Sequence, residues 1–173
     1  MVTRRRAGKR HSSAGGVGLV SAHGARAMGR DGSERGRCWK LPHTADVGLA
    51  AVAPSAEALL ETLSAGFAGL LADRRAVRPR EEWPVRVTGA GFVSVMERWL
   101  DEQLFLWETR RFLTRRARVD RVTPGAAQGV LLGERYEASR HAQLLAVKAV
   151  TKHASRFEED RDGTWHGRVY LDI

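Results

Sequence analysis

The last nine residues of the chain alternate between apolar and polar side chains, and this pattern constrains the fold more than any other. The apolar set is Val169, Leu171 and Ile173, and the polar set is Arg168, Tyr170 and Asp172. A period of two predicts a half-buried β-strand. The sequence therefore ends inside an ordered strand, which holds the carboxylate of Ile173 beside that of Asp172. Two anions about 4 Å apart repel each other by about 4 kcal/mol at an effective dielectric constant of ~20, so we expect a cation nearby.

Two further residues are unusual for their surroundings. Asp46 stands at the entrance of a strand predicted over 47–52, and Lys148 interrupts an apolar run over 144–150 that predicts another strand. A buried ammonium group needs a partner. One site that Asp46 and Lys148 share with the carboxylates at the end of the sequence would explain these anomalies together.

The chemistry of this predicted site is that of oxygen ligands. Asp46, Asp172 and the Ile173 carboxylate suit a hard cation such as Ca²⁺, Mg²⁺ or Mn²⁺. The chain has one cysteine, which excludes a thiolate zinc site and an internal disulfide and is consistent with a reducing compartment. Lys148 would balance the negative charge or approach a phosphate, and His43 would contribute a nitrogen to the same region.

Two helices are expected between the strands. The first begins at Ser55 as N-cap residue, with an apolar stripe formed by Leu59, Leu63, Phe67 and Leu70. The second runs from Phe92 to about Glu108, and its broad apolar face predicts a central helix packed against a sheet. Asp101 and Glu102 flank that face and are most simply a solvated charged edge.

The remaining strands are predicted over 85–88, 112–122 and 130–136, the last two joined across Pro124–Gly125. The Asp162–Gly163 turn then leads into the terminal strand. No run approaches the roughly 18 apolar residues that a membrane-spanning helix needs. We therefore expect one soluble domain over 38–173.

The first 37 residues differ from the rest. They contain nine Lys and Arg but two acidic residues, so most of the net charge of +9 belongs to them. Rich in Gly, Ser, Ala and Arg, this segment is predicted to be a disordered basic extension. Its composition is similar to that of a transit peptide, without a convincing amphipathic helix. A dispensable extension, with Met28 as an alternative start, is the simpler interpretation, and weak attraction to RNA phosphates is the functional one.

Four stretches, in order, resemble the archease family. They are His43–Gly48 (HTADVG), Trp99–Leu104 (WLDEQL), Val147–His153 (VKAVTKH) and Arg168–Ile173 (RVYLDI). The HTAD element and the LDI ending together are specific, and the resemblance covers Trp39 to the end.

This resemblance implies an accessory protein of the GTP-dependent RNA ligase that seals tRNA halves after intron removal. Such proteins promote guanylylation of the ligase and its multiple turnover, and tRNA or other RNA is their indirect partner. The resemblance places metal ligands at Asp46, Asp172 and Ile173, and implicates Lys148 in activating the ligase. It also implies a cytoplasmic protein that is not itself an enzyme, with an α+β fold in which a mixed or antiparallel sheet is covered by two main helices.

Four positions depart from the family pattern. The family usually has Asn at Asp101, Glu-Leu at Glu102–Gln103 and Tyr at Lys152. None of these changes touches the expected metal ligands. Asp101 and Glu102, like His43, are kept as supporting candidates.

Two other functional classes are considered beside this one. A chaperone-like interaction module without metal chemistry would bind its partner through helix faces, with Trp99 and Trp107 as its apolar surface. A stand-alone metal-dependent hydrolase would need a general base, for which only His43 and His153 qualify. No Gly-rich phosphate loop, nucleophile elbow or metal-binding His pair supports the hydrolase.

Overall fold

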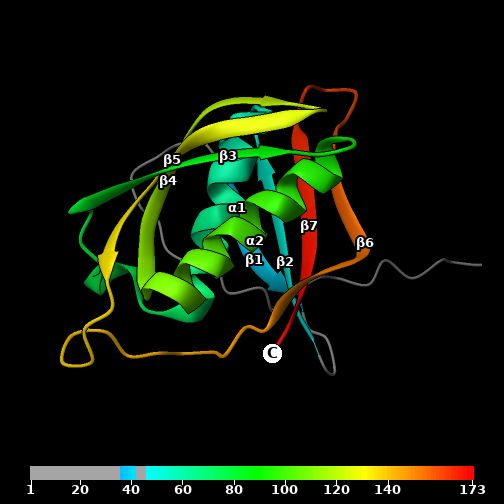
Figure 1. Ribbon diagram of the computed structural model, residues 1–173. Helices are drawn as coiled ribbons and strands as arrows, with labels where there is room; N and C mark the ends of the chain where they lie inside the picture. The colour runs from blue at the N-terminus through cyan, green and yellow to red at the C-terminus, as the bar shows by residue number, and fades with distance from the viewer. Residues whose placement is uncertain (1–35, 42–45) are drawn as a thin grey trace, which may run out of the picture.

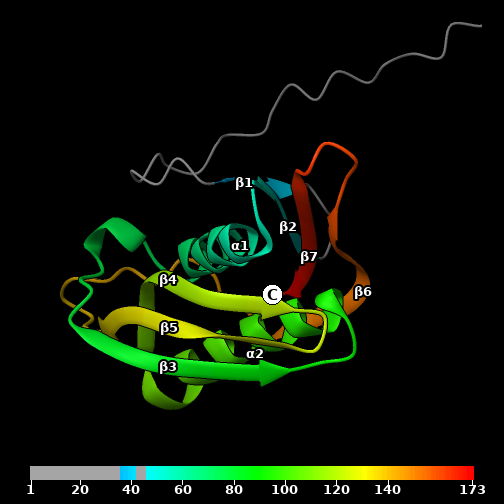
Figure 2. The ribbon, with the colours of Figure 1, turned by 90° about the horizontal axis from the view of Figure 1, so that it is seen from above.

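The computed structural model describes residues 36–41 and 46–173, which form two α-helices packed between two antiparallel sheets (Figure 1, Figure 2). The expected α+β class is confirmed. In chain order the elements are β1 (Arg37–Leu41), β2 (Asp46–Ala53), α1 (Ala56–Leu71), the 3-10 helix η1 (Arg74–Ala76), β3 (Glu81–Thr88), α2 (Phe92–Arg110), β4 (Phe112–Thr123), β5 (Ala126–Arg135), β6 (Ala149–Glu159) and β7 (Trp165–Asp172). Within these two ranges, none of the helices combines the length and the apolar character that crossing a membrane requires.

The strands are divided between two sheets. The four-stranded sheet has the order β1-β2-β7-β6, so the terminal strand β7 lies in its interior, and the three-stranded sheet has the order β3-β5-β4. The predicted hairpin across Pro124–Gly125 is confirmed as the connection between β4 and β5. A register shift between Thr114 and Arg116 marks an irregularity in β4. It explains why apolar and polar residues alternate poorly over 115–118 in the sequence. Most of the basic segment lies outside the described residues, so its disorder stays a prediction.

Helix α1 begins and is oriented as its sequence predicts. The hydroxyl of Ser55 accepts a hydrogen bond from the N–H of Ala58 at 3.2 Å, which caps the first turn. The predicted apolar stripe is completely buried, with no exposed surface at Leu59, Leu63, Phe67 or Leu70. Because α1 packs on β2 of one sheet and on β4 of the other, this stripe joins the two sheets.

Gly66 allows strand β1 to lie against α1. A Cβ atom placed on Gly66 would come within 2.5 Å of the Sγ of Cys38, so a larger residue would require the Cys38 side chain to move. The same close packing raises the pKa of the Cys38 thiol to about 12, because burial disfavours the thiolate. Cys38 is therefore a packing residue that stays protonated at neutral pH.

Helix α2 confirms the second predicted helix, and Arg111 caps its C-terminal end. This residue has a left-handed conformation with φ of 52°, and its N–H donates to the carbonyl oxygen of Trp107 at 3.0 Å. Trp99 and Trp107 are 0% and 4% exposed. The expectation that these two indoles form an exposed binding surface is therefore wrong, because both belong to the hydrophobic core.

The apolar run over 144–150 does not form the strand that its composition predicts. Strand β6 begins only at Ala149, and the residues before it run alongside the end of α1. There the N–H groups of Leu144 and Leu145 donate to the carbonyl oxygens of the last two α1 residues, at 2.9 and 3.1 Å. The last turn of a helix leaves its carbonyl groups without partners. The run supplies those partners, which removes it from the sheet.

A buried polar pair joins the two helices. The Oγ of Ser64 donates to the Oε1 of Gln103 at 2.5 Å, and the Nε2 of Gln103 donates to the main-chain oxygen of Ser64 at 3.1 Å. Both residues are almost completely buried, with exposed fractions of 0% and 1%. Gln103 can therefore occupy an apolar helix face, because its amide finds its partners on α1.

Replacing Gln103 with leucine is expected to lower the free energy of unfolding by about 1–3 kcal/mol, because Ser64 loses a buried partner. The double variant Ser64→Ala/Gln103→Leu should lose clearly less than the sum of the two single variants, because no hydroxyl is then left unpaired. Urea unfolding of the four proteins of this cycle measures the coupling. Strictly additive losses would contradict it.

Candidate functional site

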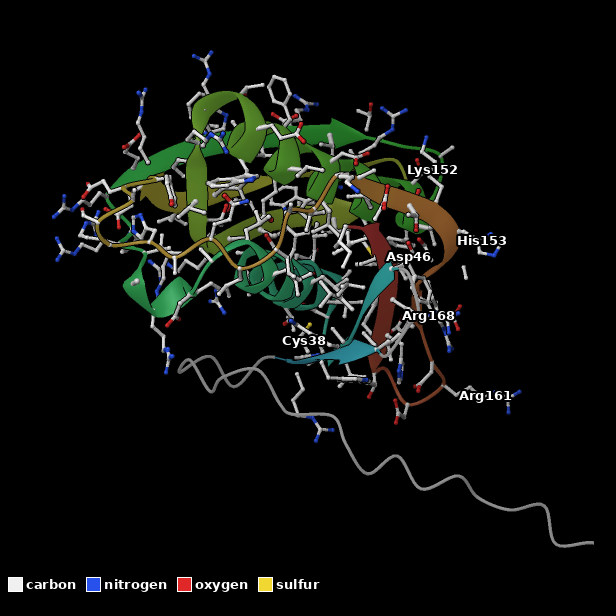
Figure 3. All side chains as sticks on the ribbon, turned by 90° about the horizontal axis from the view of Figure 1, so that it is seen from below. Cys38, Asp46, Lys152, His153, Arg161 and Arg168 are labelled. Carbon is white, nitrogen blue, oxygen red and sulfur yellow. The ribbon has the colours of Figure 1, made fainter. Side chains whose placement is uncertain are left out.

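Asp46 and Asp172 lie together at one end of the four-stranded sheet. Asp46, which is labelled in Figure 3, begins β2. Asp172 ends β7, and the two residues are direct partners across the antiparallel pair. On the other side of β7, Ala149 is the partner of Asp172. Directly opposed residues share one face of a sheet, with Cβ atoms about 4.5–5.5 Å apart. The register therefore brings two residues from opposite ends of the domain sequence to one place.

Lys148 reaches the same place from outside β6. Its N–H donates to the main-chain oxygen of Asp172 at 2.8 Å, and its Nζ donates to the main-chain oxygen of Ile173 at 3.0 Å. The prediction that Lys148 lies within a strand is wrong, since the residue is exposed and precedes β6. Its ammonium group nevertheless lies beside the end of β7, as the hypothesis of a single site requires.

The donor set at this end of the sheet is compatible with a hard cation. Carboxylates at opposed strand positions destabilise the pair, and a cation bound between them would offset this repulsion. Carboxylate and main-chain oxygens are the ligands that Ca²⁺, Mg²⁺ and Mn²⁺ prefer, unlike structural zinc. In the part of the chain that the structure describes, no three His, Cys, Asp or Glu side chains form a metal-binding group. A cation here would therefore also use main-chain oxygens, such as that of Ile173, or ligands from another molecule.

Two of the three supporting candidates lie on helix α2. His43 belongs to the segment 42–45, outside the described residues, so its role stays a prediction. Asp101 and Glu102 lie on α2 and line a surface groove together with Arg98. Burial raises the pKa of Asp101, although the neighbouring Lys152 acts in the opposite direction. Two positions that depart from the family pattern, Asp101 and Lys152, are thus electrostatic neighbours.

Strand β6 contains an irregular segment beside this end of the sheet. Its pairing with β7 is interrupted between Thr151 and Arg156, and Ala154 has a φ of 56°. The Nε of Arg168 donates to the carbonyl oxygen of Ala154 at 3.0 Å. His153 is exposed in this segment, on an edge strand (Figure 3). Its place at the surface does not favour the hydrolase alternative, because a general base works best where solvent is excluded.

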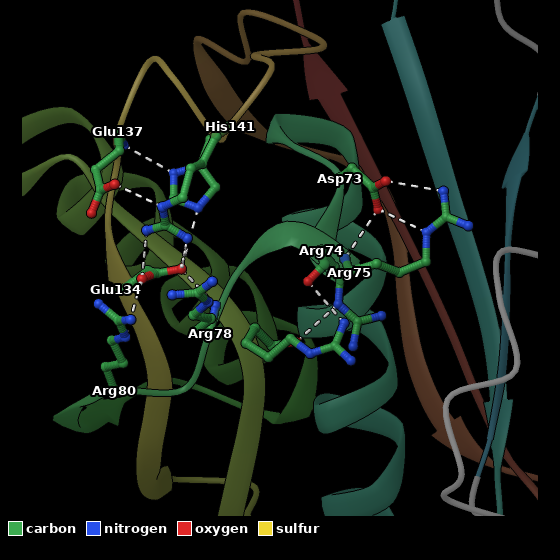
Figure 4. Close-up of polar contacts among 10 residues, drawn as sticks. Asp73, Arg74, Arg75, Arg78, Arg80, Glu134, Glu137 and His141 are labelled. Carbon is green, nitrogen blue, oxygen red and sulfur yellow. Dashed lines mark hydrogen bonds and ion pairs between the residues drawn. The ribbon is translucent and has the colours of Figure 1, made fainter.

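A second polar cluster, which the sequence does not predict, lies at the end of β5 (Figure 4). Glu134 is only 3% exposed. Its carboxylate accepts hydrogen bonds from the guanidinium of Arg140 at 3.1 and 2.8 Å and from the N–H of Arg78 at 2.7 Å. These bonds, led by the one from Arg140, lower the pKa of Glu134 to about 2.

His141 completes this cluster from the loop that follows β5. It is 1% exposed, and its Nε2 lies 3.2 Å from the Oε1 of Glu134. Its Nδ1 accepts a hydrogen bond from the N–H of Glu137 at 2.9 Å, which leaves Nε2 as the donor to Glu134. The contacts of Arg140 and His141 with Glu134 tie this loop to β5, and that of Arg78 ties the segment before β3 to it, so the cluster is structural.

Comparison with known proteins identifies relatives of this chain. The Archease protein family (MTH1598/TM1083) matches residues 39–173. The chain is 31% identical over 137 residues to protein archease of Methanopyrus kandleri, which covers 78% of this chain and 97% of that protein. It is 32% identical over 133 residues to protein archease of Methanothermobacter thermautotrophicus, covering 75% and 94%.

A solved structure has the same fold. The solution structure of Methanobacterium thermoautotrophicum protein 1598 is similar to this chain with a TM-score of 0.65 and 28% sequence identity. The match covers 79% of this chain and 98% of that protein.

Proposed function

The chain belongs to the archease family, and from this premise we propose that it is a metal-binding accessory protein of a GTP-dependent RNA ligase. It promotes guanylylation of the ligase and its multiple turnover in tRNA splicing or RNA repair. It acts in the cytoplasm and is not itself an enzyme. The observation that carries the proposal is the direct pairing of Asp46 with Asp172 beside Lys148.

In this proposal, Asp46, Asp172 and the main-chain oxygen of Ile173 hold a Ca²⁺, Mg²⁺ or Mn²⁺ ion. Such an ion supplies charge neutralisation for the phosphates of a nucleotide. The proposal is supported by the register of β2 with β7, since it aligns both carboxylates on one face without any rearrangement of the backbone. The exposure of Asp172 and Ile173 leaves the site open to a second protein.

Lys148 is the second functional group of the proposed site. Its main chain is bonded to Asp172 and its ammonium group to Ile173, so both ends of the residue are fixed to the end of β7. Nucleotidyl transfer depends on positioning and charge neutralisation. An ammonium group beside a carboxylate-bound cation can provide both when the ligase docks on this surface.

A chaperone-like module without metal chemistry is the alternative, and exposed apolar residues favour it. Phe105 and Leu144 are 52% and 54% exposed, whereas Trp99 and Trp107 are buried. Under this alternative, replacing Phe105 with serine would reduce the stimulation of the ligase and Lys148 would be dispensable.

The test is the joining of cleaved tRNA halves by the cognate ligase, with RNA in large excess over ligase. The expected result is many products per ligase with this protein and few without it. Lys148→Met should lose the stimulation because it removes the ammonium group. Lys152→Met, which removes the same charge from the irregular segment of β6, should keep it. Full stimulation of the ligase by Lys148→Met would contradict the proposal. If Phe105→Ser also failed to stimulate the ligase, the two results together would favour the chaperone alternative.

A further inference from the structure

The outer face of the three-stranded sheet carries basic residues that the proposed metal site does not use. Arg86 on β3, Gln128 on β5 and Arg121 on β4 are direct partners in register, so their side chains lie in one row. The neighbours of Arg86 along β3, Val85 and Val87, pack into the hydrophobic core. Because successive side chains of a strand point to opposite faces, the row points away from the core.

This row lines a shallow surface groove. Arg86, Gln128 and Arg121 form it together with Thr123 and two alanines of β5, and its volume is about 190 Å³. The guanidinium group presents N–H donors in a fork that matches the oxygens of a phosphate, and the amide of Gln128 adds a further donor. We call this feature the Arg86–Arg121 groove.

The acidic residues around the two arginines decide which ligand the groove can bind. Among residues 36–41 and 46–173, neither Arg86 nor Arg121 forms an ion pair, whereas Arg118 on the same strand as Arg121 lies 3.3 Å from Asp120. Glu82 stands on the same face but four residues away from Arg86 along β3, which is about 13 Å. Arg86 also lines the neighbouring groove that contains Asp101 and Glu102 of α2. Among the described residues, however, none that lines the Arg86–Arg121 groove itself is acidic. The complement of this groove is therefore an anion with repeated charges.

We propose that the Arg86–Arg121 groove binds the phosphate backbone of an RNA strand. The choice of RNA rests on the proposed function, since the ligase joins RNA ends, and the inference adds a direct RNA contact to it. Adjacent strands lie about 4.8 Å apart, so the two arginines start about 10 Å apart across β5 and can bind different phosphates of one strand.

The groove is remote from the proposed metal site. In Figure 1 the three-stranded sheet lies on the upper side of the molecule, whereas the chain ends on the lower side, beyond β7. RNA held on the outer sheet face therefore leaves the end of β7 accessible to the ligase.

The experiment measures binding of a fluorescent single-stranded RNA of about 12 nucleotides to the full chain by anisotropy, over a series of salt concentrations. Arg86→Gln/Arg121→Gln is compared with wild type and with Arg135→Gln/Arg161→Gln, which removes the same charge from other parts of the surface. Losing two phosphate contacts should make the negative slope of log K against log salt less steep by about 1.4. It should also weaken RNA binding on the order of 50-fold near 50 mM salt. Arg86→Lys/Arg121→Lys should retain most of the slope, which separates loss of charge from loss of fold.

Three results would overturn the inference. The first is no RNA binding by wild type, and the second is an equal loss in both glutamine variants, which would assign binding to the overall charge. In the third, binding of polyglutamate depends on Arg86 and Arg121, whereas binding of RNA does not depend on them. That result would assign the groove to an acidic protein. Guanylylation of the ligase by GTP requires no RNA, so failure of that reaction would test the proposed function separately.

Discussion

Replacement of Glu134 with alanine is expected to lower the free energy of unfolding by about 3 kcal/mol. Glu134 is almost fully buried, and its removal leaves the buried His141 without its carboxylate partner and Arg140 without its bidentate one. Breaking a buried ion pair by removing one member costs about 3–5 kcal/mol, because the other member stays behind in a poorly solvated place. Denaturant unfolding of wild type and variant measures the difference.

The pH dependence gives this prediction a second readout. The pKa of Glu134 in the folded protein is about 2, below the ordinary value of 4.5. A depressed folded-state pKa contributes stability that is fully present above the ordinary value and is lost as the pH falls through the folded-state value. The difference in the free energy of unfolding between wild type and Glu134→Ala should therefore be constant above about pH 5 and should become smaller towards pH 2.

Glu137→Ala is the matched control. Glu137 also accepts a hydrogen bond from Arg140, at 2.7 Å, but its side chain is about half exposed. Exposed ion pairs contribute little to stability, so this variant should unfold almost like wild type. Equal losses of stability in Glu134→Ala and Glu137→Ala would contradict a structural role of the Glu134 cluster. A stability difference between wild type and Glu134→Ala that does not change with pH would contradict it as well.

The second large effect is expected at the proposed metal site. Asp172→Asn should weaken divalent-cation binding, measured by calorimetry with Ca²⁺, Mg²⁺ and Mn²⁺, by more than about 100-fold. Losing a group that only supports a ligand already costs about 10–100-fold, and the loss of a ligand should cost more. Glu108→Gln, which removes an exposed charge from α2, should bind the cation as wild type does.

Thermal melting separates loss of the ligand from loss of the fold. Without a divalent cation, Asp172→Asn should melt at or slightly above the wild-type temperature, because it relieves the repulsion from Asp46 across the strand pair. With the cation present, only the wild type should be stabilised further. A variant that binds the cation as tightly as wild type, or a wild type that binds none, would exclude Asp172 as a ligand.

The regular elements were largely predictable from the sequence because their signals are local. The Ser55 cap and the apolar stripe after it indicate α1, and the alternation of the last residues indicates β7. The unusual positions of Asp46 and Asp172 in the sequence predict that they share a site, and the register of β2 with β7 makes them direct partners. The division of the strands between two sheets could not be predicted from any local pattern, because it depends on pairing between strands that are far apart in the sequence.

The errors have physical causes that a single sequence does not reveal. The run around Lys148 is apolar, but it pairs with carbonyl groups at the end of α1, so its composition gives the wrong element. Trp99 and Trp107 lie on a helix packed between two sheets, and a second layer covers the face that a one-sheet architecture would expose. The Glu134 cluster depends on a loop that turns back over β5, and no periodicity signals such a contact.

In the proposed function, the Asp46–Asp172 end of the sheet activates an RNA ligase. The most direct test is guanylylation of the cognate ligase by GTP and a divalent cation, without this protein, with wild type, and with Asp172→Asn. We expect a clear increase in guanylylated ligase with wild type and a yield near the ligase-alone level with Asp172→Asn. Equal stimulation by the two proteins, or none by wild type, would contradict it.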